Sequence, residues 1–247
     1  MKSTIFYIAD GSPALTFTAE YLTNRGKTVV SEPGDRVTHV VLPVPGFRDG
    51  GLEDLLGKLP KDVTIFGGKL DADGFDGYRT VDLLQDELYL AENAAITADC
   101  AVRIVGTRLR VAFRGCPMLV IGWGRIGKCL ATLLSAMGAE VTVAARKEKD
   151  RATARALGFE IADMEQLKLQ LARYRVIFNT APAPVLTEGQ MRACREGCVK
   201  IDLASKKGME GSDVIWARGL PGKDTPESSG MLIGKTVLRL MAREGIK

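Results

Sequence analysis

The sequence is poor in histidine and has no long apolar run. Its 247 residues include one histidine, His39, which lies within an apolar segment and is expected to be a core or sheet-edge residue. No apolar stretch approaches the ~20 residues that a membrane-spanning helix needs, and the first apolar run is interrupted by Asp10. The sequence therefore predicts neither a signal peptide nor a membrane segment, and a cytoplasmic location is expected.

Aromatic residues and unbalanced charge are also scarce. Aromatic side chains make up 6% of the chain, and the net charge of +4 is spread along the sequence. A nucleic-acid-binding surface needs a basic stripe with interleaved aromatic residues, so nucleic acid is not expected as a partner. The five cysteines are an odd number and are expected to be reduced thiols: Cys100, Cys116, Cys129, Cys194 and Cys198. No C-x-x-C motif accompanies them, and no metal site is predicted.

Apolar runs of strand length alternate with helical patterns, as in a parallel sheet with helices on both faces. Ser12 can cap the first expected helix, with Pro13 at its first position. A long apolar stripe at 87–105 predicts one continuous helix. Before it, we expect strands at 4–9, 28–30, 37–42, 63–66 and 78–81, and helices at 13–25 and 52–59.

The second half of the chain repeats the alternation, and residues 219–222 (GLPG) are predicted to form a tight turn. Strands are expected at 118–121, 141–144, 159–161, 176–178, 199–203 and 214–216, and helices at 125–137, 149–157, 164–172, 187–193 and 226–243. The predicted fold class is α/β, with two doubly wound parallel-sheet domains. These are a flavodoxin-like, catalytic-type domain at 1–86, an interdomain helix at 87–106, and a Rossmann dinucleotide-binding domain at 107–247 that includes the C-terminal helix.

The most informative motif joins a strand to a helix at Gly122, Gly124 and Gly127, which have the G-x-G-x-x-G spacing. The first glycine permits a tight turn, the second lets the backbone approach a pyrophosphate, and the third lets the helix pack closely on the strand. The free N–H groups at the start of the helix point at the phosphates. The cofactor contacts expected here are Gly122, Trp123, Gly124, Arg125, Ile126 and Gly127.

The end of the next strand bears on which dinucleotide binds. An acidic residue about twenty positions after the first glycine would bind the ribose hydroxyls of NAD. The chain instead has Ala145, Arg146 and Lys147 there, and the first carboxylate is Glu148. Arg146 can stack on adenine and, with Lys147, bind a 2′-phosphate through charge-assisted hydrogen bonds. The sequence therefore favours NADP, with a solvated basic loop as the alternative.

Ligands gather at the carboxyl ends of parallel strands, and this edge supplies the remaining candidates. Two later strand ends are expected to contact the cofactor, through Asn179, Thr180, Ala181 and Pro182 and through Leu203, Ala204 and Ser205. Strand ends of the first domain and polar residues of the interdomain helix are the candidates for holding an acidic substrate or facing the cleft: Pro43, Arg48, Lys69, Asn93, Thr97 and Asp99. Ordinary surface positions are the alternative reading of the strand-end residues.

Several of these segments together resemble the A subunits of dipicolinate synthase, a bacterial sporulation enzyme. The resemblance covers residues 88–245, where DLAS at 202–205 and GLPG at 219–222 are its specific motifs. Its other matching segments are NAAITADCA at 93–101, the glycine unit with Arg125, Gly138-Ala139, Ala145-Arg146, Asn179-Thr180-x-Pro182, Pro226 and Gly230. The first domain matches only in its strand order and at Leu42–Val44.

The resemblance implies a fold like that of the formate/glycerate dehydrogenase group. It also implies NADP-linked oxidation of a dihydrodipicolinate from the lysine/diaminopimelate pathway to pyridine-2,6-dicarboxylate, together with a partner, the flavoprotein-like B subunit. The chain departs from the family in two places. Ala98-Asp99-Cys100 stands where the family commonly has Ala-Glu-Gly, and the first domain is shortened.

Such a reaction requires the protein to orient two rings and to hold two carboxylates. Lys69, Lys206 and Lys207 are the candidate cations, and Ser205 and Thr180 are candidate hydrogen-bonding groups. The candidate proton acceptors are Asp99 and Asp202, although Asp202 can instead brace its own loop.

Two alternatives stay open for the function. One is an NADP-dependent 2-hydroxyacid-type dehydrogenase, but no histidine follows His39 to form the histidine–carboxylate pair that such an enzyme uses. The other is a non-catalytic dinucleotide-binding or assembly subunit whose partner carries the chemistry. The sequence leaves the oligomeric state open, a homodimer included.

Overall fold

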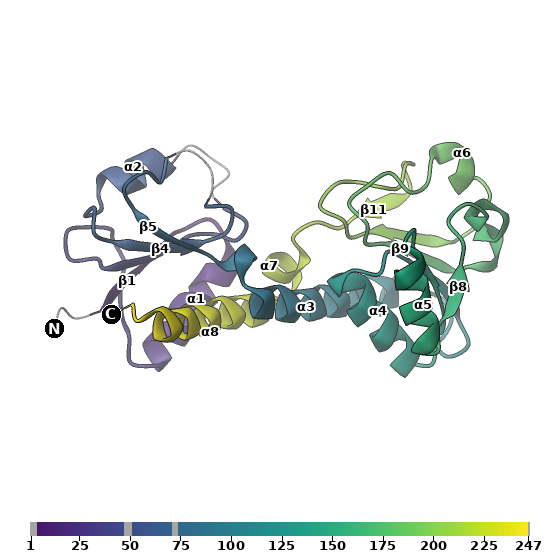
Figure 1. Cartoon of the computed structure of the whole chain (residues 1–247), viewed down its shortest axis with the longest axis horizontal. Helices are drawn as coiled ribbons and strands as arrows, with labels where there is room; N and C mark the ends of the chain where they lie inside the picture. The colour runs from purple at the N-terminus through teal and green to yellow at the C-terminus, as the bar shows by residue number, and fades with distance from the viewer. Residues whose placement is uncertain (1–3, 47–50, 71–73, 247) are drawn as a thin grey trace. The chain divides into compact units, whose positions relative to one another are not determined.

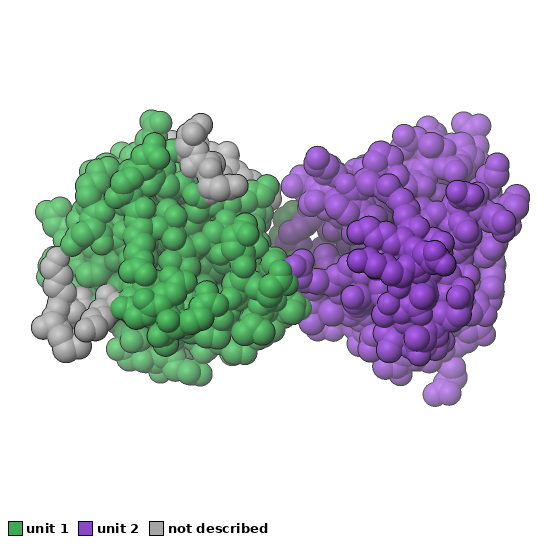
Figure 2. Space-filling model, in the orientation of Figure 1, with its two compact units in different colours: residues 1–93, 221–247 green, residues 94–220 purple. Residues whose placement is uncertain are grey.

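The computed structural model describes residues 4–46, 51–70 and 74–246, and the substrate candidate Arg48 lies outside them. The chain forms two compact units (Figure 2). The first unit consists of residues 1–93 and 221–247, and the second unit consists of residues 94–220. Each is built on a parallel sheet with alternating helices, so the predicted α/β class is confirmed. Among the described residues, no helix is long and apolar enough to cross a membrane.

The sheet of the first unit has the strand order β2-β1-β3-β4-β5, which is that of flavodoxin-like folds. Its strands are β1 (Ile5–Ile8), β2 (Thr28–Val30), β3 (His39–Val41), β4 (Thr64–Gly67) and β5 (Arg79–Asp82). The connecting helices are α1 (Pro13–Asn24) and α2 (Leu52–Gly57). Ser12 occupies the N-cap position of α1, but its side chain makes no capping hydrogen bond. Fully buried side chains such as Val40 and Ile65 form the core.

The sheet of the second unit has the order β11-β10-β9-β6-β7-β8, the Rossmann order in which the direction of winding reverses at β6. Its strands are β6 (Pro117–Ile121), β7 (Glu140–Ala144), β8 (Glu160–Ala162), β9 (Val176–Asn179), β10 (Val199–Asp202) and β11 (Val214–Trp216). Its helices include α4 (Arg125–Ala136), α5 (Glu148–Ala156) and α6 (Glu188–Met191). The helix α3 (Glu87–Gly106) begins in the first unit and continues into the second.

The prediction that residues 107–247 form one domain is wrong for their last part. The helix α8 (Pro226–Glu244) lies against α1 and belongs to the first unit (Figure 1). The two helices approach closely at Gly230, where a Cβ atom would lie 2.2 Å from the carbonyl oxygen of Ala14. An apolar stripe predicts that a helix buries one face, but it does not say against which unit.

Two smaller predictions are also wrong. The segment 164–172 forms two 3₁₀ turns, Leu167–Leu169 and Leu171–Arg173, in place of a helix, and each turn buries its first leucine. The segment 219–222 is not a tight turn, since α7 (Leu220–Asp224) begins within it. A proline in the first turn of a helix is favourable because its missing N–H would have no helical partner there.

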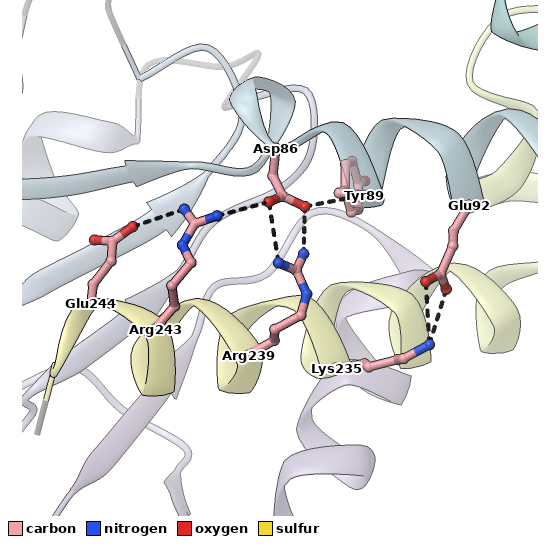
Figure 3. Close-up of polar contacts among 7 residues, drawn as sticks. All are labelled: Asp86, Tyr89, Glu92, Lys235, Arg239, Arg243 and Glu244. Carbon is pink, nitrogen blue, oxygen red and sulfur yellow. Dashed lines mark hydrogen bonds and ion pairs between the residues drawn. The ribbon is translucent and has the colours of Figure 1, made fainter.

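A polar cluster connects α8 with the start of α3 inside the first unit (Figure 3). The buried carboxylate of Asp86 forms ion pairs with Arg239 and Arg243, and it accepts a hydrogen bond from the backbone N–H of Tyr89 at 2.8 Å. Burial raises the pKa of Asp86, but the hydrogen bonds from Arg239 and Tyr89, together with the charges of Arg239 and Arg243, outweigh burial and hold the pKa below its usual value. The carboxylate therefore stays charged and joins the two helices.

Candidate functional site

The glycine-rich turn between β6 and α4 leaves no room for side chains at two of its glycines. A Cβ atom at Gly122 would lie 2.4 Å from Oγ1 of Thr180, and the backbone there has a φ of +103°. A Cβ atom at Gly127 would lie 2.2 Å from the carbonyl oxygen of Gly122. Gly124 differs, because no other atom lies within 4 Å of the place where its Cβ would be. The turn is thus closed on the protein side and open at Gly124, as expected for a phosphate-binding loop.

A pocket of about 360 Å³ lies at the carboxyl ends of β6, β7 and β9. It brings together many of the predicted cofactor residues, namely Gly122, Trp123, Gly124, Ala145, Arg146, Lys147, Thr180, Ala181 and Pro182. It is also lined by residues that the sequence reasoning missed: Ile121, Ala144, Asp150, Met164, Ala183 and Val185. The first turn of α5 opens on the same edge of the sheet, which is the signal that could have identified Asp150. Nothing in the sequence marks Met164.

The other predicted cofactor residues do not line this pocket. Arg125, Ile126 and Gly127 lie in the first turn of α4, and Asn179 is the buried last residue of β9. Leu203 and Ala204 are buried after the end of β10, and the side chain of Ser205 is exposed. The predicted set therefore follows one edge of the second unit.

The basic loop after β7 is held from within α5. Arg151 donates hydrogen bonds from Nη1 to the carbonyl oxygens of Ala145 and Arg146, at 2.9 and 2.7 Å. The side chains of Arg146 and Lys147 are exposed at the pocket wall, and no ion pair joins either to a described residue. Arg151 thus fixes the backbone of a loop that carries two exposed cations, Arg146 and Lys147.

Trp123 stands in the pocket wall with a buried polar atom. Its side chain is 6% exposed and packs edge-to-face against Phe159, with 5.5 Å between the ring centroids. Within the described part of the chain, its Nε1–H has no hydrogen-bond partner. The pocket that Trp123 lines combines the open glycine turn with two exposed cations, Arg146 and Lys147, which suits a ligand that carries phosphates. The residues present thus fit a dinucleotide.

Asp202 is the centre of a buried hydrogen-bond network below the loop that follows β10. Its Oδ1 accepts hydrogen bonds from Nδ2 of Asn179 at 3.1 Å and from the backbone N–H of Ala204 at 3.0 Å. Its Oδ2 accepts from the backbone N–H groups of Gly208 at 2.7 Å and Met209 at 2.9 Å. Both oxygens are fully used and the side chain is completely buried. With neither oxygen free to take a proton from substrate, the geometry favours the alternative, in which Asp202 braces this loop, over its use as a proton acceptor.

The remaining catalytic and substrate candidates are divided between the two units. Pro43, Lys69 and Asn93 belong to the first unit, and Thr97, Asp99, Ser205 and Lys206 belong to the second. In the second unit, Thr97 is buried on α3, whereas Asp99, Ser205 and Lys206 are exposed. Lys207 donates a hydrogen bond to the carbonyl oxygen of Gly211 at 3.3 Å. None of these residues lines the pocket at β6. The structure therefore brings many of the cofactor candidates together in one pocket but does not bring the substrate candidates there.

Neither His39 nor the cysteines belong to this site. His39 is buried in β3, with its ring close to those of Phe6 and Phe66, and burial together with nearby cations lowers its pKa to about 4. Cys194 and Cys198 are free thiols whose mutual interaction lowers the pKa of Cys194, while that interaction and burial raise the pKa of Cys198. In the residues that can be described, no group of three or more potential metal ligands occurs.

Known proteins are similar in sequence to part of the second unit and to most of the whole chain. Residues 105–195 match the family described as D-isomer specific 2-hydroxyacid dehydrogenase, NAD binding domain. The A subunit of dipicolinate synthase from Bacillus subtilis (strain 168) is 22% identical to the chain, over 85% of this chain and 80% of that protein.

Three solved structures share the fold of nearly the whole chain. The A subunit of dipicolinate synthase from Bacillus halodurans has a TM-score of 0.85 at 21% identity and covers 98% of this chain and 99% of its own. The A chain of dipicolinate synthase from Bacillus subtilis has a TM-score of 0.82 at 20% identity, with 98% and 97% covered. A transhydrogenase from Sinorhizobium meliloti has a TM-score of 0.76 at 14% identity, with 96% and 93% covered.

The resemblance predicted from the motifs is thereby confirmed. The second unit carries a domain of the kind that binds nicotinamide dinucleotides in dehydrogenases, which supports an oxidoreductase. The chain as a whole is similar in sequence and in fold to the A subunits of dipicolinate synthase.

Proposed function

We propose that this chain is the A subunit of a dipicolinate synthase, which oxidises dihydrodipicolinate to pyridine-2,6-dicarboxylate with NADP during sporulation. In this proposal its partner is the flavoprotein-like B subunit. The observation that carries the proposal is the pocket of the second unit, where a glycine turn and two cations, Arg146 and Lys147, line one cavity. The identity of the proposed substrate comes from the similarity to the A subunit of dipicolinate synthase.

The chemistry divides between cofactor and protein. A bound nicotinamide ring supplies a hydride acceptor, and formation of the aromatic product favours the forward direction. The chain supplies binding and orientation: the N–H groups at the start of α4 hold the pyrophosphate, and Arg146 and Lys147 hold the 2′-phosphate. Ser205 and Lys206 are proposed to contact the substrate, and Asp99 remains the proposed proton acceptor now that Asp202 is assigned to the loop.

The test mixes the purified chain with NADP and freshly prepared dihydrodipicolinate, with and without the partner, and follows the absorbance of NADPH. NADPH formation by the chain alone supports an independent enzyme, and formation only with the partner supports an enzyme of two subunits. Binding of NADP without any turnover in either mixture would favour the alternative, a dinucleotide-binding assembly subunit. Failure to bind NADP at all would overturn the proposal.

Arg146→Asp is expected to change the choice of cofactor. The substitution should weaken NADPH binding by about 10- to 100-fold and leave NADH binding nearly unchanged, since a charge-assisted contact contributes on the order of 1.5–3 kcal/mol. Binding can be followed by energy transfer from Trp123, which lines the pocket, to the reduced nicotinamide.

Arg155→Asp is the matched control for this substitution. Arg155 is exposed on the same helix that follows the basic loop, but it does not line the pocket. The control should bind both cofactors as the wild type does. Equal losses of NADPH and NADH affinity in Arg146→Asp would remove Arg146 from the role of reading the 2′-phosphate.

A further inference from the structure

An arginine stacked on a tryptophan stands at the end of β11. The guanidinium carbon of Arg218 lies 5.0 Å from the centroid of the Trp216 ring. The indole is 43% exposed, yet its Nε1–H donates a hydrogen bond to the carbonyl oxygen of Ala204 at 3.1 Å. Trp216 is thereby fixed to the loop after β10, and Arg218 is fixed to Trp216.

This pair lies at the same edge of the sheet as the cofactor pocket. β11 pairs in parallel with β10, with Trp216 opposite Asp202, and the backbone N–H of Ala217 donates to the carbonyl oxygen of Asp202 at 2.8 Å. β10 pairs in the same way with β9, whose end leads into Thr180 and Ala181 in the pocket wall. The ends of the three strands therefore form one continuous edge.

The strand order indicates which half of a dinucleotide faces this edge. The pyrophosphate of a dinucleotide sits where the winding reverses, at β6, and the two nucleoside halves extend to either side. Arg146 and Lys147, at the end of β7, take the adenosine side. The nicotinamide half is therefore expected over β9 and β10, and the end of β11 is the next position along the same edge.

The charge of Arg218 is available for an anion. Its side chain is exposed, and within the described ranges no carboxylate forms an ion pair with it. A guanidinium held over a ring can still donate hydrogen bonds from its N–H groups, and their planar arrangement matches the two oxygens of a carboxylate. Holding the group on a ring also reduces the rotational freedom that binding would otherwise remove.

We propose that Arg218, positioned by Trp216, binds one carboxylate of the substrate beside the nicotinamide half of the cofactor. The inference rests on the proposed function for the identity of that substrate, a ring that carries two carboxylates. It adds a substrate residue in the second unit, where Ser205 and Lys206 are the other candidates.

The test titrates pyridine-2,6-dicarboxylate and pyridine-2-carboxylate into the full-length chain at saturating NADPH, by calorimetry. The wild type should bind the diacid more tightly than the monoacid. Arg218→Gln should weaken diacid binding by at least about tenfold and remove most of that preference. Trp216→Leu should give part of the same loss, and Trp216→Phe, which retains a ring, should give less.

The matched control is Arg195→Gln. Arg195 is exposed in the turn before β10, at the opposite edge of the sheet, and should leave both affinities unchanged. Wild-type affinity for the diacid in Arg218→Gln would overturn the inference, as would a wild type with no preference for it. NADPH formation by the wild type is measured in a separate experiment. It tests the proposed function independently of the affinities measured for Arg218→Gln.

Discussion

Asp202→Ala is expected to destabilise the second unit by about 3–5 kcal/mol, because it leaves four buried donors without their acceptor. These donors are Nδ2 of Asn179 and the backbone N–H groups of Ala204, Gly208 and Met209. Urea unfolding followed by tryptophan fluorescence measures this loss, since both tryptophans, Trp123 and Trp216, lie in the second unit.

Two further variants sharpen this experiment. Asp202→Asn has nearly the same shape but turns an N–H₂ group toward donors that need an acceptor, so it should also destabilise the unit. Glu196→Ala removes an exposed acid from the turn before β10 and should change the free energy of unfolding by no more than about 0.5 kcal/mol. An Asp202→Ala protein with wild-type stability but no turnover would contradict the structural role and restore the catalytic one.

The pH dependence of stability is expected to show a large contribution from His39. Burial, with Lys27 and Arg79 nearby, lowers the pKa of this group from 6.5 to about 4 in the folded chain. Between these pH values the unfolded chain binds a proton that the folded chain does not. The contribution of neutral His39 to the stability of the folded chain is therefore complete above pH 6.5 and is lost as the pH falls toward 4. At 1.36 kcal/mol per pKa unit, the loss amounts to about 3 kcal/mol.

Thermal unfolding of the wild type and of His39→Leu between pH 7 and pH 4 measures this contribution. The leucine variant should show a shallower dependence over that range, and the remaining slope belongs to carboxylates. Because the chain has one histidine, its imidazole resonances can be assigned without ambiguity and their pKa read directly by NMR. A folded-state pKa near 6.5 would contradict the prediction, whatever the unfolding curves show.

The parts of the site that were predictable from sequence depend on local geometry. Gly122 and Gly127 are required by contacts within one strand–turn–helix unit, and their spacing alone indicates that unit. The role of Asp202 was not predictable, since a carboxylate at a strand end can equally bind a substrate or a loop. Three of its four partners lie in the loop that directly follows it, and the fourth, Asn179, is brought to it from the end of β9 by folding.

The same distinction explains the errors in the fold. Strand positions were predicted well, because a buried parallel strand is a short apolar run in any context. The place of α8 depended on which unit its apolar stripe would pack against, and that is a long-range contact which periodicity does not encode. Arg218 was missed for a related reason: nothing in the sequence shows that the ring of Trp216 supports it.

The division of the first unit between residues 1–93 and 221–247 has a consequence for how the protein is made. During translation, the face of α1 that receives Gly230 leaves the ribosome long before α8 does. The second unit is a single continuous segment and can fold before α8, the helix that packs on α1, has been made. A chain released before α8 is made would therefore contain a complete dinucleotide-binding unit and an incomplete first unit. In that first unit the face of α1 that α8 normally covers would be exposed, which favours proteolysis or aggregation.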